Sequence, residues 1–509
     1  MRARTGSDGL PITLQAADHA ALDRVGGATV LARPSNYTSS SSSFWPTCSW
    51  GDKSQVVWPE YKFPWIARVV TSSPWPRTVA VGRSAAGNQG VATLLDHPAL
   101  GGVVTPIDYQ LRGVGGITEP EGIVDSIVLR GKAFFAECDI RTYHDDVEKG
   151  FYGTARNLTE FEAINWRNVA AALTRGFNPY WMDLVGDWYG DPAIHRTIKR
   201  STDVLRESAE LPHTTVPGIA VILDDRSVLD TNGNGSFLHQ AILADLKTGL
   251  SRCGIPYRIY LLEDLALSQF PEHCVFYFPN LFRVTPEKLD LLKSKVFTNG
   301  HLVLWGPGSG ISDGTKIGID AAEELTGFAF DFLDINDPRL VQVTDFEHPI
   351  TANLPADTFF GTPLAYGPLM TPRDGRILGT CHGRSGKARG GLALKDFRQE
   401  GSPSTGWISL FTAAVPLPAN LWRNIARFAG AHIYSESNDV LMASLEVVAL
   451  HSIKSGPKTI HLPRMSSVRD LISGELLGTS NEIEFVLQAP QGVWLETLRV
   501  RYKLEERKF

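Results

Sequence analysis

The sequence has no excess of basic residues, no long apolar run and no signal-like N-terminus. Its formal net charge is −6, whereas a nucleic acid or an acidic membrane surface attracts a basic face. No run approaches the roughly 18 consecutive apolar residues that a membrane span needs, and the first residues lack the apolar stretch of a secretory signal. We therefore expect no nucleic-acid partner, no membrane partner and a cytoplasmic location.

Cysteine is also scarce, and its spacing excludes two classes of small fold. The five cysteines are odd in number, widely scattered and free of any C-x-x-C spacing, which argues against a disulfide framework and against a structural zinc site. They are Cys48, Cys138, Cys253, Cys274 and Cys381. The histidines show no H-E-x-x-H pattern, so we predict no catalytic metal and no cofactor.

The composition is that of a packed globular protein long enough for about three domains. Apolar residues make up 43% of the 509 residues and charged residues 20%. Residues 1–95 hold a serine run and a tryptophan cluster with little periodicity, so we expect an irregular or divergent segment there. The remaining pattern divides into three predicted domains, at 96–212, 213–435 and 436–509.

Short apolar runs that end in polar residues characterise the first of these domains. GGVVTPIDY (101–109), KAFFAECDIRT (132–142) and NPYWMDLVGDW (178–188) alternate with amphipathic helix patterns that begin near Asn157 and Pro192. Such alternation is typical of parallel α/β structures, and the polar ends mark where buried strands emerge into loops. We predict part of a TIM-type (β/α) barrel.

The second and third domains are predicted to be a flavodoxin-like three-layer domain and a small C-terminal β-sandwich. Four apolar strands alternate with helices between 217 and 306, and Thr285 with Pro286 provides a helix start. The loop GPGSG (306–310) lacks the spacing of a nucleotide-binding loop, so we expect it to be solvent-exposed or packed at a domain interface, with no phosphate. After 436, apolar and polar residues alternate between turn signals.

The segment 132–142 carries the strongest chemical signal. Glu137 ends a buried strand, and Asp139 and Arg141 follow at a period of two. Barrel enzymes keep their catalytic groups at the carboxyl ends of strands, so a carboxylate here could lie under the anomeric carbon of a sugar while an arginine keeps it ionised. A structural ion pair at a strand end explains the same pattern equally well.

Two neighbouring segments supply candidate substrate-binding residues. Trp181, Asp183 and Trp188 follow the third strand, and a tryptophan beside a carboxylate suits the apolar face and the hydroxyls of a sugar. Ordinary packing explains Trp181 about as easily. The other segment carries Asp108, Tyr109 and Arg112 into a glycine-rich loop, whose glycines favour turn geometry over phosphate binding.

Together these motifs resemble the family 42 β-galactosidases. P-I-D-Y-x-x-R-G-x-G-G, K-A-F-F-A-E-C-D-I-R-T and F-N-P-Y-W-M-D look like the last barrel strands of that family, and G-I-A-V-I-L-D-D through G-H-L-V-L-W is similar to its trimerisation domain. The resemblance, which covers residues 95–485, implies that Glu137 is the nucleophile. It also implies an acid/base glutamate preceded by asparagine. No such pair lies upstream, which leaves Glu60, Glu119 and Asp183 as candidates for the second carboxyl.

Two functional hypotheses follow, with a third from the shape of the middle domain. The first is a retaining exo-β-galactosidase that hydrolyses terminal β-galactosides or related glycosides. The alternative is a non-catalytic carbohydrate-binding or assembly protein that kept the trimerisation platform and lost part of its active site. A flavodoxin-like nucleotide binder is the third, and an absent spectral shift on mixing with FMN would exclude it.

The resemblance to the trimerisation domain predicts a homotrimer. Three copies close a ring through heterologous contacts between an apolar surface and its complement. Light scattering at micromolar concentration should return three times the mass of one chain. A monomer mass would contradict this prediction.

Overall fold

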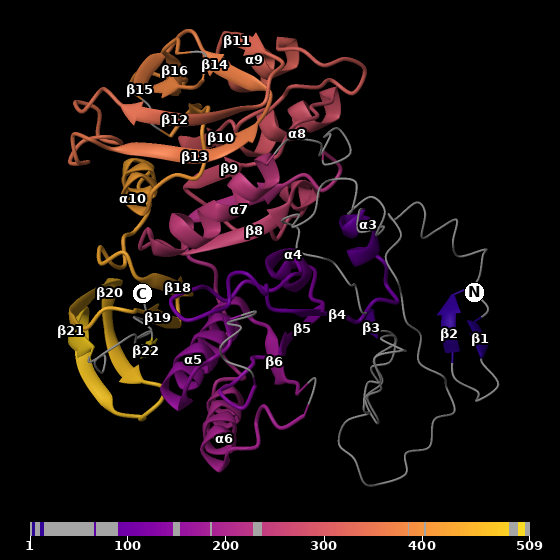
Figure 1. Ribbon diagram of the computed structural model, residues 1–509, viewed down its shortest axis with the longest axis vertical. Coiled ribbons are helices and arrows are strands. Elements are labelled where there is room, and N and C mark those ends of the chain that lie inside the picture. The colour runs from indigo at the N-terminus through magenta and orange to yellow at the C-terminus, as the bar shows by residue number, and fades with distance from the viewer. Residues whose placement is uncertain are drawn as a thin grey trace.

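The structure is a computed structural model with a mixed α/β fold (Figure 1). The residues that it describes are 3–5, 11–14, 66–67, 90–145, 153–183, 186–227, 237–384, 386–401, 404–487 and 497–503. Within the predicted irregular segment 1–95 these ranges contain a short antiparallel pair, strand β3 and helix α3. The pair is β1 (Ala3–Thr5) with β2 (Pro11–Leu14), and α3 spans Val91–Leu95.

Four parallel strands that lie between residues 66 and 181 form one sheet. Its order is β3-β4-β5-β6, and its members are β3 (Ile66–Ala67), β4 (Gly102–Pro106), β5 (Ala133–Cys138) and β6 (Asn178–Trp181). Helices follow the last three strands: α4 (Val124–Leu129), α5 (Leu158–Arg175) and α6 (Pro192–Glu207). The described strands form an open row, so the closure of a barrel stays a prediction.

Local sequence signals set the ends of the two long helices in this part. The Asn157 side chain accepts a hydrogen bond of 3.0 Å from the backbone N–H of Glu160, which caps the start of α5, and such a cap stabilises a helix by about 1 kcal/mol. Gly176 ends α5 at a φ of +75°. Asp191 caps α6, whose first residue is Pro192. Both predicted helix starts are confirmed.

The largest sheet has nine strands, in the order β13-β12-β15-β16-β17-β10-β9-β7-β8. Five of them are parallel, in the order that doubly wound sheets adopt: β7 (Ile219–Leu223), β8 (Tyr257–Leu261), β9 (Val275–Phe278), β10 (His301–Trp305) and β17 (Trp407–Thr412). Four antiparallel strands extend it: β12 (Asp337–Val343), β13 (Phe359–Tyr366), β15 (Arg376–His382) and β16 (Arg389–Asp396). Every residue of β7 and β9 is buried, as expected for parallel strands covered on both faces.

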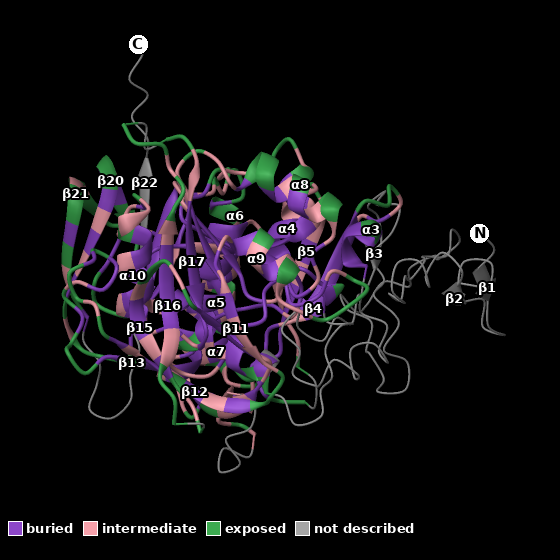
Figure 2. Ribbon diagram, turned by 90° about the horizontal axis from the view of Figure 1, so that it is seen from above, coloured by how far each residue is buried: buried purple, intermediate pink, exposed green. Residues whose placement is uncertain are grey.

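Helices and short elements pack around this sheet. The middle of β16 and most of β17 are buried (Figure 2). The helices are α7 (Leu238–Thr248), α8 (Pro286–Lys295), α9 (Asp320–Thr326) and α10 (Ala419–Phe428). The short elements are the 3₁₀ turns η4 (Leu250–Arg252) and η5 (Leu262–Ala266) and the pair β11 (Phe330–Leu333) with β14 (Leu369–Pro372). Thr285 caps α8 through the N–H of Lys288, which confirms the predicted start of that helix.

The loop 306–310 is buried, so it is not solvent-exposed, and the alternative prediction that it packs at a domain interface stays a prediction. Its Ser309 hydroxyl donates to the Gly306 carbonyl oxygen at 2.9 Å, and the Gly310 N–H donates to Leu281 at 2.8 Å. A Cβ added to Gly310 would lie 2.6 Å from the Cα of Ala322. The glycines therefore allow close backbone packing within the same part of the fold.

The C-terminal strands within the described residues form one antiparallel sheet of five strands rather than the two facing sheets of the predicted β-sandwich. Its order is β18-β19-β22-β20-β21, with β18 (Val440–Ala443), β19 (Val447–His451), β20 (Gly456–Asp470), β21 (Leu476–Leu487) and β22 (Thr497–Lys503). The long strand β20 pairs with both β21 and β22. This shared strand joins β21 and β22 into one sheet.

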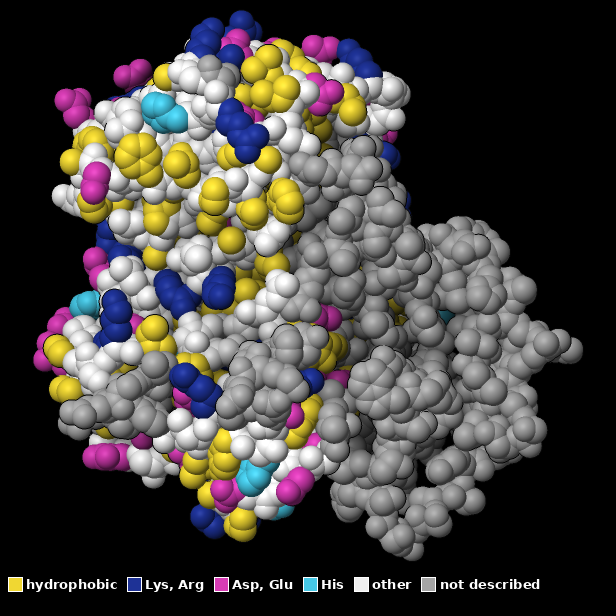
Figure 3. Space-filling model, in the orientation of Figure 1, with side chains coloured by type: hydrophobic (Ala, Val, Ile, Leu, Met, Phe, Trp, Pro, Cys, Tyr) yellow, Lys and Arg dark blue, Asp and Glu magenta, His cyan; other side chains and the backbone are white. Residues whose placement is uncertain are grey.

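The surface mixes charges of both signs. Lys and Arg side chains are interspersed with Asp and Glu over the described part of the face in Figure 3, as the net charge of −6 leads one to expect. No helix in the described part of the chain is long and apolar enough to cross a membrane.

Gly254 gives a direct test of the contact between the turn that precedes β8 and the segment that leads from α10 to β18. Its φ is +82°, and an added Cβ would lie 1.7 Å from the carbonyl oxygen of Ser435. Gly430, at a φ of +83° with nothing within 4 Å of such a Cβ, is the matched control because both substitutions share the left-handed strain. We expect Gly254→Ala to lower the free energy of unfolding by at least about 2 kcal/mol more than Gly430→Ala, measured by urea denaturation. Equal losses would contradict the tight contact.

Candidate functional site

Glu137 lies near the carboxyl end of β5, on the face of the four-stranded sheet that turns away from the helices. Phe134, Ala136 and Cys138 of the same strand belong to the main hydrophobic core, and the alternation of side chains along a strand places Glu137 on the opposite face. The residue is 4% exposed, and its carboxylate accepts a hydrogen bond of 2.7 Å from the hydroxyl of Tyr180. The two residues are direct neighbours in the pairing of β5 with β6. The strand register therefore brings this tyrosine to the carboxylate.

A second group of polar side chains lies directly beyond β5. Asp139 forms a buried ion pair with Arg112 and accepts a hydrogen bond of 2.8 Å from the hydroxyl of Tyr109. Burial raises the pKa of Asp139, and the Arg112 guanidinium opposes that rise. The pKa of Tyr109 is raised by burial, then by Asp139, and also by the charge of Glu137. The hydrogen bond to Asp139 is the contact that the structure shows for Tyr109, and its predicted role in substrate binding stays a prediction.

Arg141 forms its ion pair with Asp145, at 2.9 Å. Its guanidinium carbon also lies 5.2 Å from the centre of the Trp188 ring. The buried arginine beside the strand-end carboxylates is Arg112, which comes from the loop after β4. The prediction that Arg141 keeps Glu137 ionised remains a prediction.

The remaining predicted binding residues have structural contacts in the loops. Asp108 accepts from the backbone N–H of Gln110 at 2.7 Å, and Asp183 accepts from those of Gly186 and Trp188 at 2.8 and 3.0 Å. Trp188 is buried in a small apolar cluster. Contacts of these side chains with a substrate therefore remain predictions.

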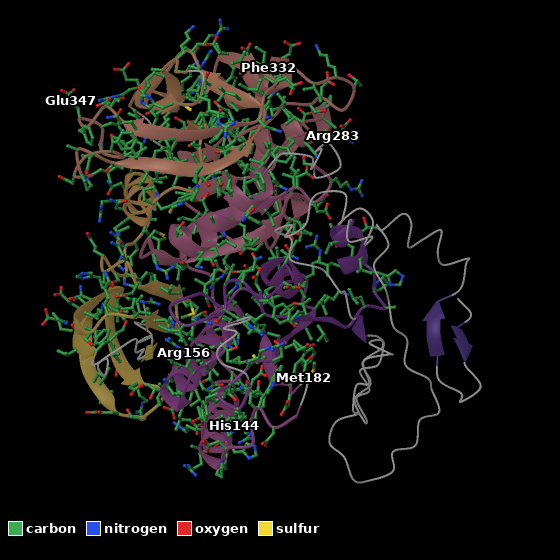
Figure 4. The ribbon with its side chains drawn as sticks, in the orientation of Figure 1. His144, Arg156, Met182, Arg283, Phe332 and Glu347 are labelled. Carbon is green, nitrogen blue, oxygen red and sulfur yellow. The ribbon has the colours of Figure 1, made fainter. Side chains whose placement is uncertain are left out.

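The half-buried Trp181 ends β6 and packs against three apolar clusters. Its ring nitrogen donates to the Asn165 side chain of α5 at 2.8 Å. Met182, the next residue, continues the pairing by donating its N–H to the Cys138 carbonyl at 3.3 Å. Figure 4 labels Met182 at this end of the sheet, and His144 in the loop after β5. The carboxyl ends of β5 and β6 are thus held together.

No family model matches the sequence, and a search of curated proteins finds no relative. Solved structures do match. The cold-adapted β-galactosidase from Rahnella sp. R3 is similar over 82% of this chain and 62% of its own, with a TM-score of 0.55 and 11% identity. A catalytic mutant of Gan42B, a GH42 β-galactosidase from G. stearothermophilus, is similar over 81% of this chain and 61% of its own, with a TM-score of 0.51 and 11% identity.

The chain has a GH42-like fold. It spans less than two thirds of the length of either protein. At this identity the likeness concerns the fold, so the chemistry of the GH42-like chain has to be argued from its own side chains.

The three predicted candidates for a second carboxyl have different outcomes. Glu60 lies outside the described residues. Glu119 is buried and forms an ion pair of 2.9 Å with Arg175, and it accepts from the Tyr257 hydroxyl at 3.0 Å. Asp183 accepts backbone hydrogen bonds from its own loop. No group of three His, Cys, Asp or Glu side chains in the described ranges could hold a metal ion.

Sequence reasoning missed Tyr180. The pattern NPYW drew attention to Trp181, whose ring is a common sugar platform, but the residue that meets Glu137 is the one before it. The alternation of side chains along a strand places Tyr180 and Trp181 on opposite faces. The register that pairs Tyr180 with Glu137 is a tertiary fact, so sequence alone could not choose between them.

The ion pairs of Arg175 generate a stability prediction. Its guanidinium contacts Glu119 at 2.9 Å and Asp125 at 2.6 Å, and all three side chains are buried. Arg175→Met leaves two buried carboxylates without this partner, so we expect a loss of about 3–5 kcal/mol of unfolding free energy in urea denaturation.

Lys199→Met is the control for that experiment. Lys199 is 77% exposed and pairs with Asp203 on α6, and exposed pairs of this kind contribute little to stability. If both variants unfold at the same urea concentration, the buried network does not stabilise the junction.

Proposed function

We propose that this chain is a glycoside hydrolase of the β-galactosidase type, with Glu137 as its catalytic carboxylate. The single observation that carries the proposal is the position of Glu137 at the carboxyl end of a parallel strand, hydrogen-bonded by Tyr180 at 2.7 Å. Carboxyl ends of strands are where barrel enzymes hold their catalytic groups. The GH42-like fold supports the same assignment.

The proposed reaction is hydrolysis of terminal β-galactosides or related glycosides with retention of configuration. The Glu137 carboxylate attacks the anomeric carbon while a second carboxyl protonates the leaving oxygen, and water then cleaves the glycosyl ester. The Tyr180 hydroxyl orients the nucleophilic carboxylate. Asp139 and Tyr109, which are joined by a hydrogen bond of 2.8 Å, would accept from and donate to the hydroxyl groups of the sugar.

The proposed domain architecture is taken from the likeness to the two β-galactosidase structures. Residues 96–212 would be the last part of a (β/α) barrel, 213–435 a flavodoxin-like trimerisation domain and 436–509 a small β domain, with three chains in the assembly. The doubly wound strand order of the middle part supports the second assignment. Sugar would be the ligand of the first part, with Asp108 and Arg112 on the loop after β4 as binding residues, whereas Trp181 lies on the face of β6 opposite to Tyr180 and contacts α5.

A second candidate function is non-catalytic carbohydrate binding or assembly. Its support is burial: Glu137 is 4% exposed, and Asp139, Arg112 and Trp188 are at least as buried. A substrate needs an open concavity that it can enter, and the bound substrate is then mostly covered by protein. The two candidates therefore differ in whether the wild-type protein turns over any glycoside.

Replacing Glu137 by Gln tests the proposed function. The amide keeps the shape and can still accept from Tyr180, but it cannot act as a nucleophile. We expect hydrolysis of a nitrophenyl β-galactoside to fall by on the order of 10³-fold or more, measured as initial rates, with an unchanged circular dichroism spectrum.

Glu162→Gln is the matched control, since Glu162 is a half-buried glutamate on α5 that accepts from Thr197 at 3.0 Å. It should retain wild-type rates. Absence of turnover by the wild-type protein on every nitrophenyl glycoside would replace the enzyme proposal by the assembly proposal.

A further inference from the structure

A cavity of about 640 Å³ lies at the edge of the nine-stranded sheet where its parallel strands begin. Pro217 shortly precedes β7, Cys274 precedes β9 and Gly300 precedes β10, and all three residues line the cavity. Ligands of open α/β sheets usually bind at the opposite edge, beyond the carboxyl ends of the strands. The described residues that line this cavity include none of the candidate site. Its volume is in the range that holds a small molecule.

His273 is a lining residue with an unusual environment. It is 4% exposed, and its ring packs among those of Tyr260, Phe270 and Phe276, at centroid distances of 5.6, 5.8 and 6.2 Å. Neither of its ring nitrogens has a hydrogen-bond partner among the described residues. Burial lowers the pKa of His273 to about 3, so the ring is neutral at pH 7. Because buried polar groups without a partner cost stability, a fold retains them where something besides stability requires them.

The half-buried His301 supplies a hydrogen-bond acceptor to the cavity that it lines. Its Nδ1 lies 3.1 Å from the Val296 carbonyl oxygen. Since a carbonyl only accepts, Nδ1 carries the proton and Nε2 holds a lone pair. Burial lowers the pKa of His301, against the opposing effects of that carbonyl and of the Glu272 charge, so this ring is also neutral. The exposed Glu272, another lining residue, adds a carboxylate with further acceptors.

An aromatic ring and a balance of charge complete the lining. Phe270 is half-buried and packs edge-on against Tyr260 of β8 at a centroid distance of 4.8 Å, so its ring is held in place while part of it stays accessible. Lys295 at the end of α8 is exposed, and its positive charge balances that of Glu272. One charge of each sign favours neither anions nor cations. Hydroxyl groups both donate and accept, which suits this mixture, and the C–H face of a sugar suits an aromatic ring.

We propose that this cavity binds a neutral sugar, at a site separate from Glu137 and its neighbours. Hydroxyl groups of the sugar donate to the Glu272 carboxylate and to Nε2 of His301, and the Lys295 ammonium donates to another hydroxyl oxygen. The apolar face of the sugar ring lies against Phe270. This site does not require a catalytic carboxylate, so it fits the hydrolase and the non-catalytic carbohydrate-binding protein equally.

Hydrogen–deuterium exchange with mass spectrometry, titrated with galactose, tests the site and locates the sugar at the same time. We expect galactose to slow exchange in residues 268–274 and 298–302, because amides there lie beside the lining side chains. Glu272→Ala removes an exposed carboxylate, so it should leave the core intact and weaken the galactose affinity read from these segments at least about tenfold. Glu272→Gln keeps an acceptor oxygen and should weaken it less.

Glu347→Ala is the matched control, since Glu347 is an exposed glutamate that does not line the cavity (Figure 4). It should bind galactose as the wild-type protein does. Galactose that slows exchange in neither segment overturns the proposal, and so does equal slowing in the wild type and Glu272→Ala. Galactosamine that binds here about tenfold more tightly than galactose assigns the cavity to cations and overturns a neutral ligand. Turnover of nitrophenyl glycosides is a separate measurement, so failure of the proposed function leaves these outcomes distinct.

Discussion

Arg175 holds two buried carboxylates at the junction between the four-stranded and the nine-stranded sheets. Glu119 precedes α4, Asp125 lies in its first turn, and Arg175 ends α5. The Asp125 carboxylate also accepts the backbone N–H of Ile259 at 2.7 Å, in the edge strand β8. Buried charges must be paired or they cost several kcal/mol. Separating the four elements that supply these groups would therefore expose a charge to solvent or leave it buried without a partner.

This constraint reaches the candidate site through the chain connections. α5 leaves the region of β5 and returns the chain to β6, so its anchored end determines where β6 begins. Fixing β6 beside β5 fixes the register that pairs Tyr180 with Glu137. The side of α5 also contacts the C-terminal strand β19 (Figure 1). One helix thus orders the site and joins it to two other parts of the fold.

Local chemistry explains which predictions were confirmed. Asn157 caps α5 and Thr285 caps α8 because each side chain meets a backbone N–H three residues away, and such contacts depend on nothing distant. The buried strands were recognisable for the same reason: runs such as 219–223 have no polar residue. The sequence pattern did not decide between exposure and burial of the loop 306–310, and it did not predict the single sheet of the described C-terminal strands, because burial and strand pairing depend on segments far away in the chain.

The sequence by itself determined the α/β alternation, the helix ends and the strand-end position of Glu137, because each follows from side chains within a few residues of one another. Only the tertiary structure decided which partners these side chains meet. Tyr180 reaches Glu137 from a strand 43 residues away. Hydrogen bonds between strands set those neighbours, and a shift of one residue would turn every side chain to the opposite face.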